Sequence, residues 1–177
     1  MTITIRAETA GDAQLIEDAI QRAYADVAYS DHREHLMVER LRGTEAFIPA
    51  LSLLAEKDGE VVGHVLLMKA SIVGEHGVFD SLALAPLSVV PEHQGQGVGK
   101  ALIIEAHRRA ARLGFSSIVL VGVPDYHPQF GYEPLSRYRV ELPFDAPAAN
   151  CMILALQPDA LVGVSGQVRY PPGWMDH

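Results

Sequence analysis

Apolar residues recur with a helical period in the first forty positions, and further along the chain the pattern becomes extended. Residues 3–5 alternate as a short strand does. Residues 9–12 are typical of a helix N-terminus, with Thr9 as N-cap and an acidic residue at N3, and a second helix is predicted over 34–42, ending near Gly43. The apolar positions of the first helix are three or four apart: Leu15, Ile16, Ala19, Ile20 and Ala23.

The middle of the chain has the pattern of β-strands. The apolar runs 52–56 and 61–68 flank Asp58-Gly59, which is a strong hairpin signal. A third extended run covers 79–90, where Pro86 removes an amide donor and indicates a bend or bulge.

A glycine-rich turn follows, and then a third helix is predicted over 98–113. After a short buried strand at 118–121 comes a helix or loop, and residues 139–142 and 151–156 are predicted to form a last strand pair. Hairpins thus come first and a strand–helix–strand unit second. This order predicts a mixed sheet in an α+β fold rather than a doubly wound parallel sheet.

Composition and charge restrict the function classes. The chain of 177 residues is 49% hydrophobic and 20% charged, which predicts one globular domain over 1–177. Its 14 Lys and Arg against 22 Asp and Glu give a net charge of −8, which disfavours nucleic acid and anionic membranes as partners. The single Cys151 excludes an intrachain disulfide. With no signal peptide and no long apolar run, a cytoplasmic protein is expected.

The glycine-rich turn carries the most specific chemistry. Gly95, Gly97 and Gly99 alternate between a strand and a helix, where the lack of a Cβ lets a ligand approach the backbone. The first amides of a helix attract anions, and Lys100 adds a positive charge, so the turn suits a phosphate. A tight turn whose glycines serve packing alone is the alternative.

Two familiar phosphate motifs are excluded, and so is a metal site. A Walker A loop needs glycine where Gln94 stands and Ser or Thr where Ala101 stands, and the dinucleotide fingerprint needs glycine at Lys100. His32 and His35 have a spacing that binds metals on a helix, but no third ligand is apparent, so we expect no metal.

The turn does match a third pattern. Residues 94–99, Gln-Gly-Gln-Gly-Val-Gly, resemble the Gln/Arg-x-x-Gly-x-Gly loop of the GNAT family, the acetyl-CoA-dependent N-acetyltransferases. Residues 87–91 resemble the strand before that loop, and 122–132 resemble the later segment that ends in Gly-Phe/Tyr. More narrowly, the chain resembles the YhbS-like branch, on residues 52–55, 63–64, 85–87, 126–132 and 166–170.

The resemblance implies a three-layer α/β/α arrangement with a central splayed strand pair, followed by a strand-rich C-terminal extension over 135–177. It places the coenzyme pyrophosphate on the loop amides and the pantetheine arm on the preceding strand. The implied coenzyme-binding residues are Leu87, Val89, Gln94, Gly95, Gln96, Gly97, Val98, Gly99 and Lys100.

The implied reaction is direct transfer of an acetyl group from acetyl-CoA to a primary amine of a small molecule or protein, without a covalent enzyme intermediate. Many members have a tyrosine proton donor four residues before the glycine of Gly-Phe. Here that position is His127, preceded by Tyr126, so alignment favours His127 and chemistry favours Tyr126. Some members carry a glutamate base where this chain has Ala83, so we expect deprotonation through water.

Two other kinds of function remain open. One is a non-catalytic acyl-CoA-binding sensor on the same fold, which the residues at 83 and 127 keep open. The other is a partner-binding module, with a homodimer through the last strands as one form of it.

Overall fold

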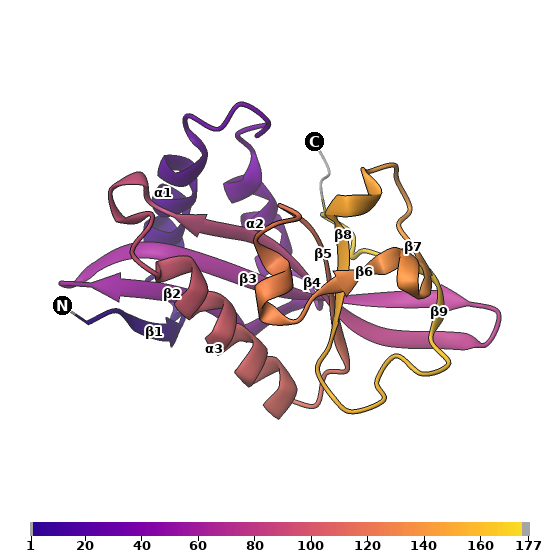
Figure 1. Ribbon diagram of the computed structural model, residues 1–177. Helices are drawn as coiled ribbons and strands as arrows, with labels where there is room; N and C mark the ends of the chain where they lie inside the picture. The colour runs from indigo at the N-terminus through magenta and orange to yellow at the C-terminus, as the bar shows by residue number, and fades with distance from the viewer. Residues whose placement is uncertain (1, 175–177) are drawn as a thin grey trace. The chain divides into compact units, whose positions relative to one another are not determined.

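A computed structural model describes residues 2–174 and contains, among them, three α-helices and a mixed, mostly antiparallel sheet (Figure 1). This confirms the predicted α+β fold. Contacts divide the chain into two compact units. Of the described residues, the first unit comprises 2–67, 85–109 and 172–174, and the second comprises Met68–Leu84 and Ala110–Pro171. The single domain over 1–177 stays a prediction.

The first unit contains the N-terminal hairpin and the helices. Strand β1 (Thr4–Ala7) pairs antiparallel with β2 (Phe47–Lys57), which neighbours β3 (Glu60–Gly74). Between β2 and β3, Asp58 and Gly59 have φ of 54° and 80°, the left-handed values that a tight hairpin turn requires, so the Asp-Gly prediction is confirmed. The helices are α1 (Ala13–Tyr24), α2 (Glu34–Arg42) and α3 (Val98–Arg112).

Helix α1 begins later than predicted. Its N-cap is Asp12 rather than Thr9, because residues 9–12 form a turn in which the Asp12 amide donates to the Thr9 carbonyl at 3.0 Å. The Asp12 carboxylate accepts from the Thr9 amide at 2.7 Å and from two nitrogens of Arg6 at 2.7 and 3.0 Å. Hydrogen bonding to Arg6 is the main reason that the pKa of Asp12 lies well below its usual value.

Gly63 of β3 is closely packed by its neighbours. A Cβ at Gly63 would lie 2.9 Å from the Ser88 carbonyl oxygen and 2.9 Å from a methyl carbon of Val98. Both distances are below those that real Cβ atoms adopt, so β3 lies directly against β4 (Gly77–Val89) and the first turn of α3. This packing positions the glycine-rich turn that precedes α3.

The second unit is built of strands. Strand β4 (Gly77–Val89), part of which belongs to the first unit, pairs parallel with β5 (Ser117–Val121). Strand β8 (Cys151–Ala155) pairs antiparallel with β5 and with β6 (Glu133–Pro134). Strand β9 (Ser165–Arg169) pairs antiparallel with β3 and parallel with β7 (Arg139–Glu141). Pro86 lies within β4 after a cis peptide bond, and the strand continues through it.

The predicted last strand pair is wrong. Residues 139–142 and 151–156 do contain strands, but β7 pairs with β9 and β8 pairs with β5 and β6. Strand β9 was missed because its sequence, Ser-Gly-Gln-Val-Arg, is polar and buries only Val168. The segment after β5, predicted as a helix or loop, is a loop with a 3₁₀ turn at His127–Phe130.

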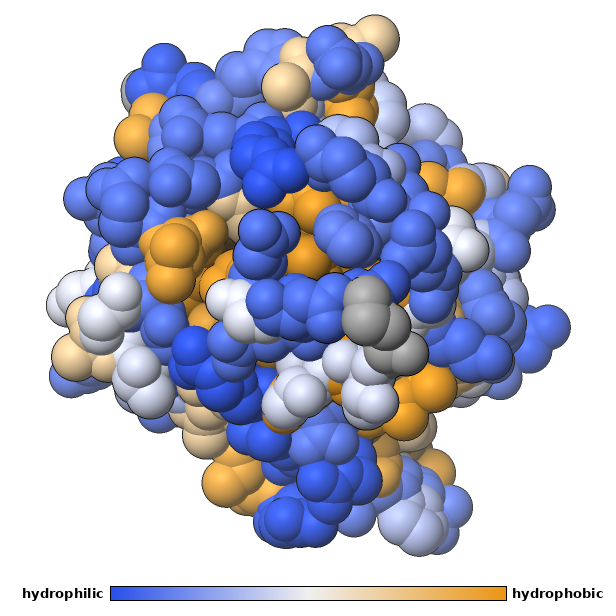
Figure 2. Space-filling view, turned by 90° about the vertical axis from the view of Figure 1, so that its left-hand side faces the viewer, coloured by the Kyte–Doolittle hydropathy of each residue, from blue (hydrophilic) through white to orange (hydrophobic). Residues whose placement is uncertain are grey.

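The surface agrees with the composition. Figure 2 shows one side of the molecule, where hydrophilic residues cover most of the surface and apolar residues appear mainly in a hollow near the centre and in smaller areas around it. No helix within residues 2–174 is long and apolar enough to cross a membrane.

Candidate functional site

The end of β4 presents main-chain groups that take no part in the pairing with β3. The Val90 amide donates to the Val62 carbonyl at 3.0 Å. Val89 and Leu87 lie one and three residues earlier, so they direct their main-chain groups to the opposite edge. The register of β4 with β5 comprises Leu82 and Ala83, so Leu87 and Val89 lie beyond it. These are the two strand residues that the sequence predicts to bind the pantetheine arm.

Side chains from the first unit cap both carbonyls at this edge. The Tyr24 hydroxyl donates to the Leu87 carbonyl at 2.8 Å, and the Gln94 amide donates to the Val89 carbonyl at 3.0 Å. Burial, and after it the charge of Glu34, raises the pKa of Tyr24 to about 12, so the phenol keeps the proton that it donates. Sequence reasoning missed Tyr24, whose only signal was an aromatic residue at the end of an amphipathic helix.

The glycine-rich turn has the geometry of an anion site. Gly95 and Gly97 have φ of 75° and 86°, and a Cβ built on either one meets nothing within 4 Å. These glycines therefore serve the left-handed backbone rather than close packing, and their outer side is open. Helix α3 starts directly after them, and its first hydrogen bond runs from Ala101 to the Gly97 carbonyl at 3.0 Å. Open amides at a helix N-terminus suit a phosphate, as predicted.

Polar side chains hold the turn in place. The Gln96 carbonyl oxygen accepts from Lys57 at 2.9 Å, and the Gln96 amide donates to the Glu92 carbonyl at 3.2 Å. Glu92 forms an ion pair of 2.7 Å with Arg22 of α1. Lys100 lies exposed in the first turn of α3. All the predicted coenzyme-binding residues therefore lie in the first unit. Those of the turn, residues 94–100, fit a pyrophosphate group.

The two predicted proton donors lie in the second unit, in the turn after β5. His127 is only 7% exposed, and its Nδ1 has no hydrogen-bond partner among the described residues. Its ring packs on the main chain of Gly122, where a Cβ would lie 2.7 Å from Nε2. Burial lowers the pKa of His127, which favours the neutral imidazole.

Tyr126 is half-buried and keeps its proton. Its ring lies edge-on to those of His127 and Phe130, with centroids 5.2 and 5.4 Å apart. Burial raises the pKa of Tyr126, so the phenol is a proton donor over the whole neutral range. The predicted alternatives thus differ in the structure: one is a buried neutral ring and the other is an accessible phenol.

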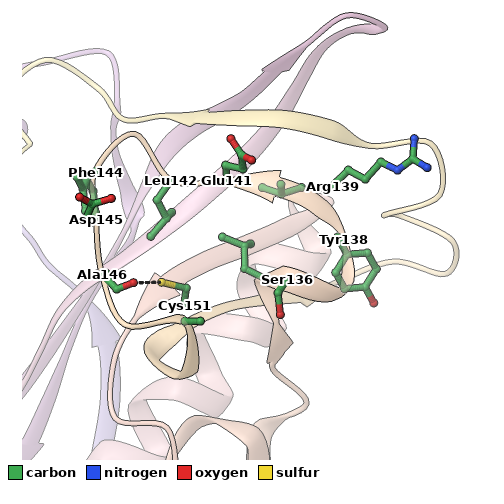
Figure 3. Close-up of a pocket in the computed structure, with 12 residues that line it drawn as sticks. Ser136, Tyr138, Arg139, Glu141, Leu142, Phe144, Asp145, Ala146 and Cys151 are labelled. Carbon is green, nitrogen blue, oxygen red and sulfur yellow. Dashed lines mark hydrogen bonds between the residues drawn. The ribbon is translucent and has the colours of Figure 1, made fainter.

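Ala83 and Cys151 are both buried. Ala83 lies in the β4 register with β5, where a base would need a carboxylate that this chain lacks. Cys151 lines a pocket of about 510 Å³ in the second unit, and its thiol points to the Ala146 carbonyl (Figure 3). Burial raises the pKa of the Cys151 thiol, so it is not an activated nucleophile. Cys151 was not predicted as a site residue, and none of the predicted site residues lines this pocket.

Comparison with known proteins identifies the class. The model of the acetyltransferase (GNAT) family matches residues 14–132, more than half of the chain, so the chain belongs to this family. The curated relative YjhQ of Escherichia coli (strain K12), an uncharacterized N-acetyltransferase, is 34% identical over 142 residues, which cover 77% of this chain and 78% of YjhQ. YhbS of the same strain, also an uncharacterized N-acetyltransferase, is 26% identical over 166 residues, covering 94% of this chain and 95% of YhbS.

Solved structures agree with this assignment. YhbS from Escherichia coli in complex with CoA has a TM-score of 0.87 at 26% identity, covering 97% of this chain and 91% of that one. A GNAT family acetyltransferase from Brucella melitensis in complex with acetyl-CoA has a TM-score of 0.80 at 31% identity, covering 98% of both chains. The predicted family and fold are confirmed. No group of three or more His, Cys, Asp or Glu that could hold a metal ion occurs among the described residues.

Proposed function

We propose that this protein transfers the acetyl group of acetyl-CoA to a primary amine of a small molecule or a protein. The observation that carries the proposal is the open, left-handed turn at Gly95 and Gly97. It lies next to the edge of β4 at Leu87 and Val89, which is beyond the register of β4 with β5. Family membership supports it, and so do the similar proteins solved with CoA and acetyl-CoA.

The residues of the first unit hold the coenzyme. Acetyl-CoA supplies a thioester whose acetyl group is activated for transfer. The amides of residues 95–99 and the ammonium of Lys100 bind the pyrophosphate. Leu87 and Val89 pair with the pantetheine arm, and the Val89 amide stabilises the charge that develops on the carbonyl oxygen. The Tyr24 and Gln94 side chains hold the Leu87 and Val89 carbonyls and so fix the strand edge.

Tyr126 gives the proton to the departing sulfur, and His127 positions Tyr126. Two properties support this choice over His127 as donor: burial favours the unprotonated imidazole, and the raised pKa of Tyr126 keeps the phenol protonated. With Ala83 at the position of the family's glutamate, the attacking amine loses its proton through water.

The proposal is tested by measuring thiol release from acetyl-CoA with a panel of primary amines, together with calorimetry of CoA binding. Amine-dependent thiol release supports the acetyltransferase. Binding of CoA without transfer to any amine would favour the acyl-CoA sensor instead. If the protein does not bind CoA, both the coenzyme site and the proposed activity are wrong.

A further inference from the structure

A pocket of about 260 Å³ lies in the first unit, where the end of α1 and the start of α2 meet the loop that joins them. One of its walls is Tyr24, the residue whose hydroxyl donates to the Leu87 carbonyl. The Tyr24 side chain therefore connects this pocket to the edge of β4 on which we place the pantetheine arm. The residues that line it are Gln21, Tyr24, Ala25, His32, Glu34 and His35.

The loop before α2 is organised around the Ser30 hydroxyl. This hydroxyl accepts from the His32 amide at 2.9 Å and donates to Oε2 of Glu34 at 2.5 Å. His32 has a φ of 61°, a left-handed conformation that is uncommon for a residue with a side chain. Ser30 thus ties His32 and the half-buried Glu34 together at the pocket wall.

The carboxylate of Glu34 gives this pocket a negative charge. Glu34 is the one Asp or Glu among the described residues that line it, and no Lys or Arg lines it. The Gln21 amide donates to Nε2 of His35 at 3.1 Å. The charge of Glu34 reaches Tyr24, because it contributes to the raised pKa of that phenol. A carboxylate in a pocket that no Lys or Arg lines is suited to a cation.

We propose that this pocket binds the acceptor and selects an amine that carries a second positive charge, which Glu34 holds. The proposal rests on the proposed function, since it uses the coenzyme position at Leu87. The reacting amine must be neutral, so the carboxylate serves the other end of the acceptor. In the transfer the amine nitrogen forms a bond with the acetyl carbon, the carbon–sulfur bond breaks, and the electron pair leaves with sulfur. The proton that the amine loses is balanced by the one that sulfur gains.

Three probes of similar length test the charge preference: putrescine with a second ammonium, n-butylamine with a neutral tail, and γ-aminobutyrate with a carboxylate. The wild type should give the highest kcat/KM with putrescine. Glu34→Gln should lower kcat/KM for putrescine by about tenfold or more, the usual effect of losing a hydrogen bond to a charged group, and leave n-butylamine unchanged. Glu34→Lys should make γ-aminobutyrate the preferred probe.

The matched control is Glu45→Gln, which removes the same charge from an exposed residue that does not line the pocket and should leave the preference unchanged. Calorimetry of putrescine binding to the CoA-saturated protein measures the affinity of the pocket without turnover. The wild type should bind putrescine, and Glu34→Gln should bind putrescine about tenfold more weakly.

The inference is overturned if the wild type does not prefer putrescine, or if Glu34→Gln keeps that preference and that affinity while CoA binding and n-butylamine turnover are normal. This result leaves the acetyltransferase assignment standing. Failure of the acetyltransferase assignment gives a different result. In that case none of the amines releases thiol from acetyl-CoA, whether or not calorimetry detects binding of CoA or putrescine.

Discussion

The Ser52 hydroxyl and Nε2 of His64 lie 2.9 Å apart in the interior of the first unit. Ser52 also donates to the Glu8 carboxylate, which pairs with Arg42 at 3.0 Å. Because the Ser52 proton goes to the carboxylate, Nε2 of His64 is the donor to the Ser52 oxygen. Burial lowers the pKa of His64, which keeps the ring neutral. Its Nδ1 has no hydrogen-bond partner among the described residues, and the ring has no exposed surface.

This arrangement predicts a loss of stability in mild acid. Burial lowers the pKa of His64 from 6.5 to about 3, so between these values the unfolded chain takes up a proton that the folded chain does not. The contribution of neutral His64 to the free energy of unfolding is complete above pH 6.5. It decreases as the pH falls toward 3, by at most about 1.4 kcal/mol per pH unit. Urea unfolding at several pH values between about 4 and 7 measures it.

Two variants separate this contribution from those of other groups. His64→Gln removes the titration, so its free energy of unfolding should depend less on pH than that of the wild type. His32→Gln, at an exposed position of the same unit, should keep the wild-type dependence. Equal pH dependence in His64→Gln and the wild type would contradict the explanation.

Gly97→Ala should weaken CoA binding by roughly tenfold, because a side chain disfavours the left-handed backbone that aims the loop amides. Gly114→Ala is the control, because Gly114 has a φ of 92° and equally open surroundings. Each substitution should lower the free energy of unfolding by about 1 kcal/mol, but Gly114→Ala should leave CoA affinity unchanged. Calorimetry and urea unfolding of both variants check this. Similar losses of CoA affinity in both would mean that backbone strain anywhere has this effect.

Tyr24→Phe should raise the KM for acetyl-CoA and lower the free energy of unfolding by about 1 kcal/mol, because the Leu87 carbonyl loses its donor. Tyr29→Phe is the control, since Tyr29 is 83% exposed in the loop after α1. Steady-state kinetics and urea unfolding give both quantities. A Tyr24→Phe protein with normal values would show that the capped carbonyl has no part in coenzyme binding.

Tyr126→Phe should lower kcat by about a hundredfold, the usual contribution of a positioned acid, with CoA affinity unchanged. Because burial raises the pKa of Tyr126, the wild-type kcat should not decline through loss of this proton at any pH below about 10. Measuring kcat against pH tests both points. If His127→Gln loses turnover and Tyr126→Phe keeps it, His127 is the donor; if both keep it, neither is.

Local patterns predicted the helices, the Asp58-Gly59 hairpin and the glycine-rich turn, because each depends on the conformation of a few consecutive residues. The pairing of β7 and β8 was predicted wrongly for the opposite reason. The partner of β7 is β9, whose Ser165–Arg169 sequence has no strong strand pattern of its own, and strand pairing depends on where distant segments meet.

The sequence by itself determined the family and the position of the coenzyme loop, since Gly95 and Gly97 occur in a left-handed turn that needs glycine whatever surrounds it. Only the tertiary structure decided that Tyr24 caps Leu87, 63 residues away, and that Glu34 lines a pocket beside it. It also decided that His127 is buried while Tyr126 remains accessible. Burial, hydrogen-bond partners and pKa values arise from residues that are distant in the chain, and a linear pattern does not contain those contacts.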